Sequence, residues 1–162
     1  MNILINEHKE LLIAMLHHKV SFILIGGYAV NYYGYDRMTG DMDIWLKPTN
    51  DNRANFLKAI SDFGIVDEDV VALSKKDFTT PQMFFFGAPP RRIDFLLLSK
   101  LSGVSYDEAT EEANHFNLET QQVPIIHYHH LLLTKMNTGR KKDEADIEEL
   151  QRINKYRNDK NT

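Results

Sequence analysis

Two aspartates one residue apart are the side chains of this sequence best suited to chemistry. Asp41 and Asp43 belong to the apolar segment 41–46, DMDIWL. A β-strand has a side-chain period of two, so both carboxylates point to one face, while Met42 and Ile44 point to the other. Neighbouring carboxylates repel each other unless a cation lies between them. Because their oxygens are hard ligands, the pair predicts a site for Mg²⁺ or Mn²⁺.

The residues before this strand offer a place for phosphate. The apolar run 22–25, FILI, stops at Gly26 and Gly27, and a short helix-like stretch follows over 28–33. Glycines let the backbone approach a ligand closely, and the start of a helix directs free N–H groups at an anion. Phosphate beside paired carboxylates that can hold metal is what phosphoryl or nucleotidyl transfer requires.

This arrangement resembles the polymerase-β-like nucleotidyltransferase superfamily. The superfamily resemblance rests on the glycine pair Gly26 and Gly27, a short helix, and the strand carboxylates Asp41 and Asp43. A fuller string resembles the branch of abortive-infection toxin nucleotidyltransferases, and it consists of Gly26, Gly27, Ala29, Gly34, Arg37, Thr39, Asp41 and Asp43. Lincosamide nucleotidyltransferases are similar at the same positions. The match extends over about residues 22–98, and more loosely over the C-terminal third.

The resemblance implies a metal-dependent reaction. A nucleoside monophosphate would pass from a nucleoside triphosphate (NTP) to a hydroxyl acceptor, and pyrophosphate would leave. Asp41 and Asp43 are then expected to bind two Mg²⁺ or Mn²⁺ ions, and Gly26 and Gly27 to hold the triphosphate through their backbone N–H groups. Catalysis would consist mainly of positioning and charge neutralisation.

The loop before the carboxylates contributes two further candidates for nucleotide binding. Arg37 or Thr39 is expected to steady the loop or to touch phosphate. An equally good interpretation of Arg37 is an ion pair with Asp36 or Asp41. The sequence alone leaves both interpretations of this arginine open.

A third carboxylate lies in another apolar strand. Segments 82–86 and 92–97 have strand character, and the turn residues 87–90, GAPP, between them predict a hairpin. Asp94 within the second strand is costly unless it is paired or bound to metal. One interpretation is an ion pair with Arg92. The other, which the resemblance favours, is a third metal ligand that also acts as the base for the acceptor hydroxyl.

Basic residues gather in the segment 135–146, KMNTGRKKDEAD. One interpretation is a solvated junction between two helices, with ion pairs at i, i+4 spacing. The resemblance instead implies that Lys135, together with Arg140 or Lys142, binds the triphosphate. Asp143 would then fix this lysine or cap the following helix.

These side chains need a scaffold, and the pattern predicts an α/β (α+β) fold, a mixed twisted sheet flanked by helices. Helices are predicted from apolar spacing and capping residues over residues 6–18, about 50–63, 105–114 and about 143–157. We expect a single nucleotidyltransferase domain over 1–162. Its catalytic core covers about 20–100, and a C-terminal helical part about 105–157.

Composition limits the class of protein. The 162 residues are 43% hydrophobic and 26% charged, which is ordinary for a globular chain, and the absence of cysteine excludes disulfides and thiolate metal sites. The formal net charge of −4 argues against general binding of polyanions. No apolar run reaches the about 18 residues of a membrane span, and no signal peptide is visible, so a cytoplasmic location is expected.

The sequence does not identify the acceptor of the nucleotide. An RNA end, a protein and a small molecule all remain candidates, and the short chain suggests that a homodimer or a partner protein completes the acceptor site. Two other functions stay open: a non-catalytic nucleotide-binding module of the toxin–antitoxin type, and an antibiotic nucleotidyltransferase of the lincosamide or aminoglycoside kind. No motif identifies the base of the NTP.

Overall fold

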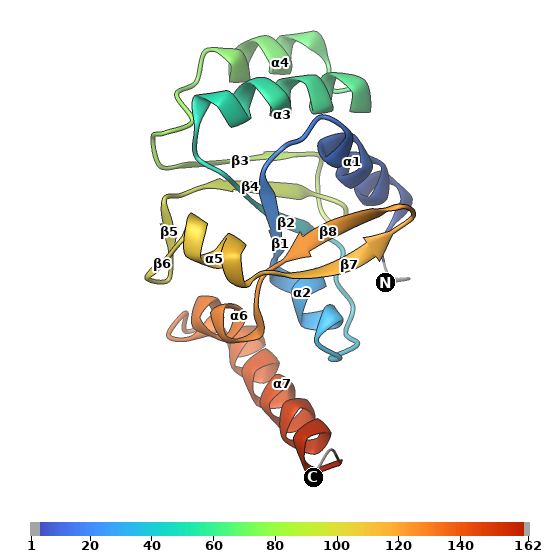
Figure 1. Ribbon diagram of the computed structural model, residues 1–162, viewed down its shortest axis with the longest axis vertical. Helices are drawn as coiled ribbons and strands as arrows, with labels where there is room; N and C mark the ends of the chain where they lie inside the picture. Colours follow the sequence, from blue (N-terminus) through green and yellow to red (C-terminus); the bar gives the residue numbers. More distant parts are fainter. Residues whose placement is uncertain (1–3, 161–162) are drawn as a thin grey trace.

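A computed structural model describes residues 4–160, which form a mixed six-stranded sheet with helices packed around it (Figure 1). The helices are α1 (Asn6–His17), α2 (Gly26–Tyr32), α3 (Asn50–Phe63), α4 (Asp67–Ser74), α5 (Tyr106–Glu112), α6 (Tyr128–Lys135) and α7 (Lys141–Lys160). The strands are β1 (Phe22–Ile25), β2 (Met42–Leu46), β3 (Gln82–Phe86), β4 (Ile93–Leu97), β5 (Lys100–Leu101), β6 (Val104–Ser105), β7 (Asn114–Leu118) and β8 (Gln121–Ile125). The expected mixed α/β fold is confirmed.

The order of the strands in the sheet is β3-β4-β2-β1-β8-β7, and β5 and β6 form a separate small ribbon. β1 is antiparallel to β2 and parallel to β8, while β2 is parallel to β4. Consequently the end of β1 lies beside the start of β2, with Ile25 opposite Asp43, and β4 starts at the same edge. The sheet thus brings three segments of the sequence to one place.

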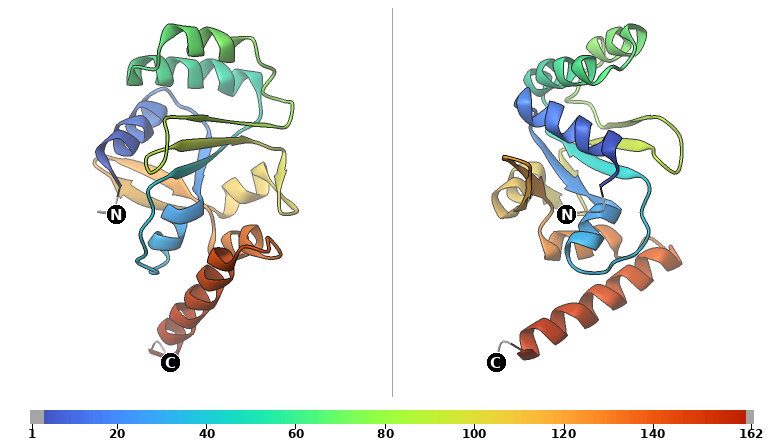
Figure 2. Two further views of the ribbon diagram at one scale, coloured as in Figure 1. Left: turned by 180° about the vertical axis from the view of Figure 1, so that it is seen from behind. Right: turned by 90° about the vertical axis from the view of Figure 1, so that its right-hand side faces the viewer.

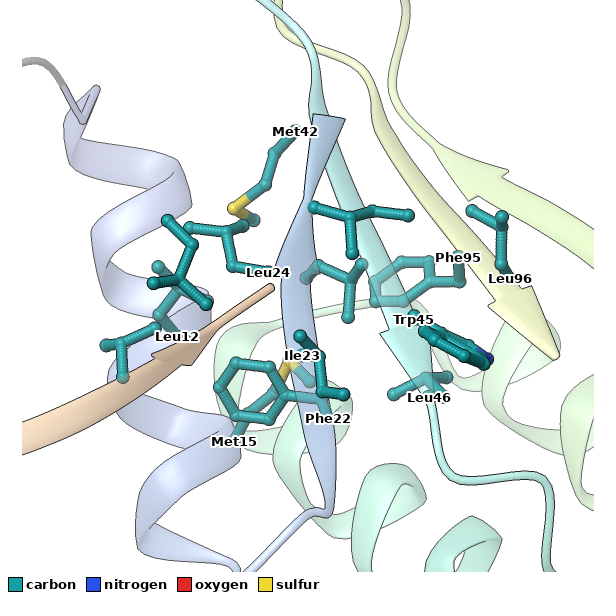
Figure 3. Packing of buried hydrophobic residues seen from close by; sticks show 14 of the residues in the cluster. Leu12, Met15, Phe22, Ile23, Leu24, Met42, Trp45, Leu46, Phe95 and Leu96 are labelled. Carbon is teal, nitrogen blue, oxygen red and sulfur yellow. The ribbon is translucent and has the colours of Figure 1, made fainter. Parts of the chain in front are cut away.

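Alternation along the strands gives the sheet one closed face and one partly open face. On the closed face, α1 and α3 cover the apolar side chains (Figure 3). The ring of Phe56 on α3, for example, lies 5.0 Å from that of Phe95 on β4. The opposite face carries Asp43 and Trp45, and Tyr106 of α5 packs against the indole at 5.3 Å. The carboxylates therefore stand on the face that the two large N-terminal helices leave uncovered.

Local capping explains where several helices begin and end. α3 begins at Thr49, whose side chain accepts a hydrogen bond from the Asn52 backbone N–H, and ends at Gly64, which has a φ of +98°. That left-handed conformation suits glycine at the end of a helix. α5 begins with the capping box formed by Ser105 and Glu108, which the sequence pattern predicts.

The C-terminal part, over about 105–157, combines helices with strands. It contains the β7–β8 hairpin, which joins the main sheet because β8 pairs with β1, Leu24 opposite Ile125. Only α5, α6 and α7 of this part are helical. α7 projects from the body of the molecule at the end opposite α3 and α4 (Figure 2). Across residues 4–160, every helix is too short or too polar to cross a membrane.

Candidate active site

The predicted carboxylates lie where β1 stops and β2 and β4 begin. Asp43 of β2 and Asp94 of β4 are opposite each other in the parallel pair. Because neighbouring strands are about 4.8 Å apart, these side chains stand next to each other on one face of the sheet. Asp41 lies directly before β2, two residues before Asp43. The sheet therefore unites carboxylates that are distant in the sequence.

The glycine turn at the end of β1 is shaped around Asp43. Gly26 has a φ of +66°, and a Cβ atom there would lie 2.1 Å from the Oδ2 atom of Asp43. A Cβ atom on Gly27 would lie 2.2 Å from the Oγ1 atom of Thr39. Both positions require glycine, because any side chain would push the carboxylate and the hydroxyl away from the turn. The turn therefore lies directly against the carboxylate of Asp43 and the hydroxyl group of Thr39.

Asp43 has an unfavourable environment for a charged group. Burial raises the pKa of its carboxyl group above the ordinary value, and the charge of neighbouring Asp94 raises it further. A hydrogen bond from the Gly27 backbone and the charge of Lys135 offset only part of this effect. A cation bound between Asp43 and Asp94 would remove the repulsion.

Arg92 connects the other two carboxylates. Its backbone N–H donates to the Oδ1 atom of Asp41 at 3.0 Å, and its Nε atom lies 3.0 Å from a carboxylate oxygen of Asp94. The ion pair between Arg92 and Asp94 is therefore present. It coexists with the placement of Asp94 beside Asp43, so the two interpretations of Asp94 do not exclude each other.

The donor set fits a divalent metal by its chemistry. Carboxylate oxygens are the ligands that Mg²⁺ and Mn²⁺ prefer, and the negative charge of Asp94 adds to burial in raising the pKa of Asp43. Within residues 4–160, however, no three His, Cys, Asp or Glu side chains are already gathered closely enough to hold a metal ion. The site as described is a pair with Asp41 nearby.

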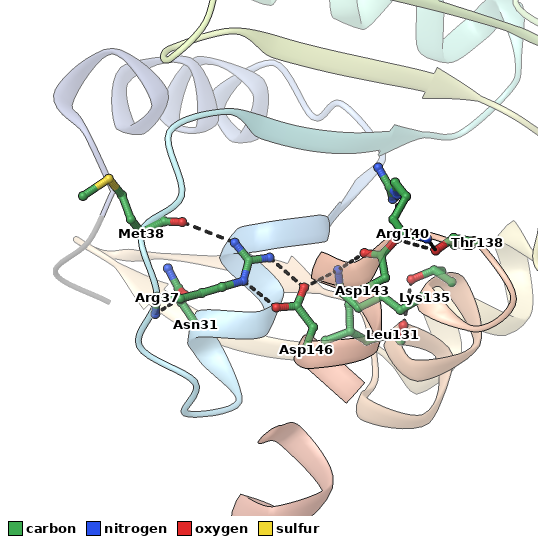
Figure 4. A network of polar contacts seen from close by, with 10 residues as sticks. Asn31, Arg37, Met38, Leu131, Lys135, Thr138, Arg140, Asp143 and Asp146 are labelled. Atoms are coloured by element: carbon green, nitrogen blue, oxygen red, sulfur yellow. Dashed lines mark hydrogen bonds and ion pairs between the residues drawn. The ribbon is translucent and has the colours of Figure 1, made fainter. Parts of the chain in front are cut away.

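On the opposite side of the site, a buried ion-pair network joins the loop before β2 to α6 and α7 (Figure 4). The Nζ atom of Lys135 lies 3.0 Å from Asp143 and 2.8 Å from Asp146. Arg37 donates to both oxygens of Asp146, at 2.6 and 2.8 Å. The alternative pairing of Arg37 with Asp36 or Asp41 is therefore wrong, because Asp146 accepts from the Nε and one Nη nitrogen of Arg37, and the other Nη nitrogen donates to the carbonyl of Met38.

The turn between α6 and α7 completes this network. Asp143 accepts hydrogen bonds from Thr138 and from the Nε atom of Arg140, each at 2.7 Å. The side chain of Arg140 is 72% exposed, and Lys142 is also exposed, so both can reach a ligand from the rim. We refer to Arg37, Lys135, Asp143 and Asp146 as the ion-pair network.

The pKa values of Asp143 and Asp146 in the ion-pair network are shifted in the opposite direction from the pKa of Asp43. Burial alone would raise the pKa of Asp146, but the hydrogen bonds and charges of Arg37 and Lys135 outweigh it and hold the pKa below the ordinary value. For Asp143, burial is likewise outweighed by hydrogen bonds from Thr138, Lys135 and Arg140 and by the lysine charge, so its pKa is also lowered. These carboxylates are fully charged at neutral pH.

One cavity of about 650 Å³ unites the site. Its lining includes every site residue predicted from the sequence, namely Gly26, Gly27, Arg37, Thr39, Asp41, Asp43, Asp94, Lys135, Arg140 and Lys142. A volume of this size is typical of small-molecule sites. The structure therefore places the predicted residues together, although their individual roles remain predictions.

Sequence reasoning missed Asp146 and the double role of Arg92. A signal for Asp146 existed: with Asp143, Ile147 and Leu150 it follows the i, i+3, i+4, i+7 spacing of a buried helix face. An acid at such a position must find a buried cation. The backbone contact of Arg92 with Asp41 had no signal in the sequence.

Comparisons with known proteins agree with this geometry. A family model described as "Nucleotidyl transferase of unknown function (DUF2204)" matches residues 5–161. Among solved structures, the chain is similar to the lincomycin-bound lincosamide antibiotic adenylyltransferase LnuA, with a TM-score of 0.53 and 18% sequence identity. This match covers 94% of this chain and 99% of the other, and it shows a common fold. A search of curated proteins gives no significant match.

Proposed function

The chain belongs to this family of nucleotidyl transferases, and from that premise we propose a metal-dependent transfer of a nucleoside monophosphate from an NTP to a hydroxyl acceptor. The observation that carries the proposal is the opposition of Asp43 and Asp94 across β2 and β4, in a cavity that also contains cationic side chains. A carboxylate pair beside a phosphate-binding surface is what such a transfer requires.

Asp41, Asp43 and Asp94 would hold Mg²⁺ or Mn²⁺, two ions in the full arrangement. The bound metal would neutralise phosphate charge and lower the pKa of the acceptor hydroxyl. The fit rests on the carboxylates that the sheet brings together and on the raised pKa of Asp43, to which burial contributes most and the charge of Asp94 adds. Asp94, which is only 13% exposed, is positioned to receive the proton of the acceptor.

The remaining cavity residues would position the triphosphate. The Gly26–Gly27 turn and Asp43 line the same cavity, so phosphate bound by the turn would lie near the carboxylate, and Lys135 and Arg140 supply positive charge. Lys135 is 7% exposed and is held by the ion-pair network, so its ammonium group has a fixed place. Fixed charges stabilise a transition state without reorganisation.

A label-transfer assay tests the proposal. The protein is incubated with each α-labelled NTP, Mg²⁺ or Mn²⁺, and a nucleotide-depleted cell extract, beside Asp43→Ala and the control Asp69→Ala, an exposed aspartate on α4. We expect label in an acceptor with the wild type and the control, and none with Asp43→Ala. NTP binding without any metal-dependent release of pyrophosphate would instead favour a non-catalytic nucleotide-binding module.

A narrower candidate is the modification of an antibiotic. The solved structure with a similar fold is a lincosamide antibiotic adenylyltransferase, which makes lincomycin a direct acceptor to test. Label in lincomycin that depends on Asp43 would support this candidate. Transfer to other acceptors with no label in lincomycin would reject it.

A further inference from the structure

Strand β3, at the edge of the sheet, presents two large apolar side chains to solvent. Met83 is 64% and Phe85 59% exposed, whereas Phe84 between them stacks on Phe95 in the core at 5.0 Å. We call Met83 and Phe85 the β3 strip. Edge strands usually carry charges, and exposed apolar surface beside a polar site marks a place where something binds.

The β3 strip lies on the face that carries the carboxylates. Phe85 is opposite Asp94, and Met83 is opposite Leu96, in the antiparallel pair of β3 and β4. Asp94 is in turn opposite Asp43. Two strand spacings, about 10 Å, therefore separate Phe85 from Asp43, with Asp94 midway. A molecule of one or two rings is long enough to span the distance between Phe85 and Asp94.

Met83 of the β3 strip lines the cavity, which extends to the side proposed for the triphosphate. Met83, Leu96 and Leu101 line it together with Lys135 and Arg140. The cationic side chains suit phosphate, whereas the apolar ones suit an uncharged body. The two kinds of lining thus match the two substrates of a transfer reaction.

Arg92 ties the aromatic ring to the carboxylate. Its guanidinium carbon lies 5.2 Å from the centre of the Phe85 ring, and its Nε atom pairs with Asp94. A cation over a ring face is attractive and limits the orientations of the ring. The Phe85 ring is therefore held beside Asp94, the group proposed to take the proton of the acceptor.

We propose that the β3 strip is the acceptor subsite and that the acceptor is a small hydroxylated molecule with an apolar or aromatic face; this rests on the proposed transferase function. A nucleic acid would bring phosphates, for which Met83 and Phe85 are no partners, to a chain of net charge −4. In the reaction, the acceptor O–H gives its proton to Asp94 and its oxygen bonds to the α-phosphorus. The bond from that phosphorus to the bridging oxygen breaks, and pyrophosphate leaves with the electron pair.

The test uses the full chain, α-labelled NTP with Mn²⁺, and cell extract separated into low-mass, RNA and protein fractions. Phe85→Ser and Met83→Ser are compared with Val71→Ser, a control at a half-exposed apolar position on α4. We expect label in the low-mass fraction on a product retained by a reversed-phase column. The strip variants should raise the apparent KM for the low-mass acceptor about ten-fold, with little change in the KM for NTP. The control Val71→Ser should leave both KM values unchanged.

Label confined to RNA or protein, or a low-mass product whose KM is the same in Phe85→Ser, would overturn the assignment while leaving transfer intact. A wild-type dimer that becomes a monomer in Phe85→Ser, seen by light scattering, would make the strip an interface between copies and also overturn it. No label in any fraction would count against the transfer itself, and the subsite would fall with it.

Discussion

Two pairs of aspartates border the same cavity, and they differ in what balances their charge. Asp43 and Asp94 on the sheet face each other, and burial together with this repulsion raises the pKa of Asp43. Asp143 and Asp146 on α7 are even more buried, at 3% and 1% exposure, yet their pKa values are lowered. Hydrogen bonds and charges from Lys135, Arg37 and Arg140 outweigh burial at the helix pair, whereas burial dominates at Asp43.

This difference separates carboxylates that hold the cavity and Lys135 in place from carboxylates that remain available to a metal ion. The ion-pair network is complete within the chain and connects the loop before β2 to α7, so it fixes the shape of the cavity. The sheet pair is incomplete, with Arg92 as a partner for Asp94 and no comparable cation at Asp43. Uncompensated buried charge is costly for folding and is concentrated at functional sites.

The largest expected effect comes from neutralising the sheet pair. Asp43→Asn keeps the size of the side chain and removes the charge that would hold the metal and the phosphates. We expect transfer to fall by about 1000-fold or more, since such groups stabilise the transition state directly. The rate of pyrophosphate release with saturating NTP measures this. A loss of less than about ten-fold would place the chemistry elsewhere in the cavity.

Breaking the ion-pair network should instead cost stability. Asp146→Asn leaves Arg37 and Lys135 buried without their shared carboxylate, and losing one partner of a buried ion pair typically costs about 3 kcal/mol. Urea unfolding followed by tryptophan fluorescence measures the free energy of unfolding. The control is Glu148→Gln, an exposed position on the same helix. Equal stability of the two variants would show that the network does not stabilise the fold.

The pH dependence of stability should have opposite signs for the two pairs. The raised pKa of Asp43 penalises the charged folded state above the ordinary carboxyl pKa of about 3.9, so Asp43→Asn should raise Tm at pH 7, with the gain vanishing in acid. Asp143 and Asp146, whose pKa values are lowered, stabilise the fold above the ordinary carboxyl pKa because they are charged there. This contribution to stability is lost as the pH falls through the lowered pKa values.

Thermal unfolding in metal-free buffer between pH 7 and pH 3 measures both effects. A destabilised Asp43→Asn variant at pH 7 would contradict the view that Asp43 is uncompensated. An Asp146→Asn variant that loses as much stability in acid as the wild type would contradict the role assigned to the network.

The smallest effect on activity is expected from the exposed residues at the rim of the cavity. Lys142 lines the cavity and is exposed, whereas its exposed neighbour Lys141 does not line it. Lys142→Ala should raise the KM for NTP about two- to three-fold at low salt, because exposed charges interact weakly. Lys141→Ala is the matched control. Identical KM values for both variants would remove Lys142 from the nucleotide side.

The sequence predicts the sheet carboxylates well because local patterns encode them. Asp41 and Asp43 stand at the start of one apolar strand, Asp94 interrupts another, and Gly26 marks the end of the strand that precedes both. The ion-pair network is harder to predict, because Arg37 and Asp146 are joined only by tertiary packing across most of the chain. The β7–β8 hairpin is similar in this respect, since its place beside β1 depends on pairing between Leu24 and Ile125.

The measurement that tests the central claim most directly is Mn²⁺ binding in the presence of a non-hydrolysable NTP analogue, followed by electron paramagnetic resonance. Wild type is compared with Asp43→Asn on the sheet and with Glu148→Gln on α7. The account predicts that Asp43→Asn weakens Mn²⁺ binding at least about ten-fold, whereas Glu148→Gln binds as the wild type does. Unchanged Mn²⁺ affinity in Asp43→Asn would contradict the claim that the sheet aspartates form the metal site.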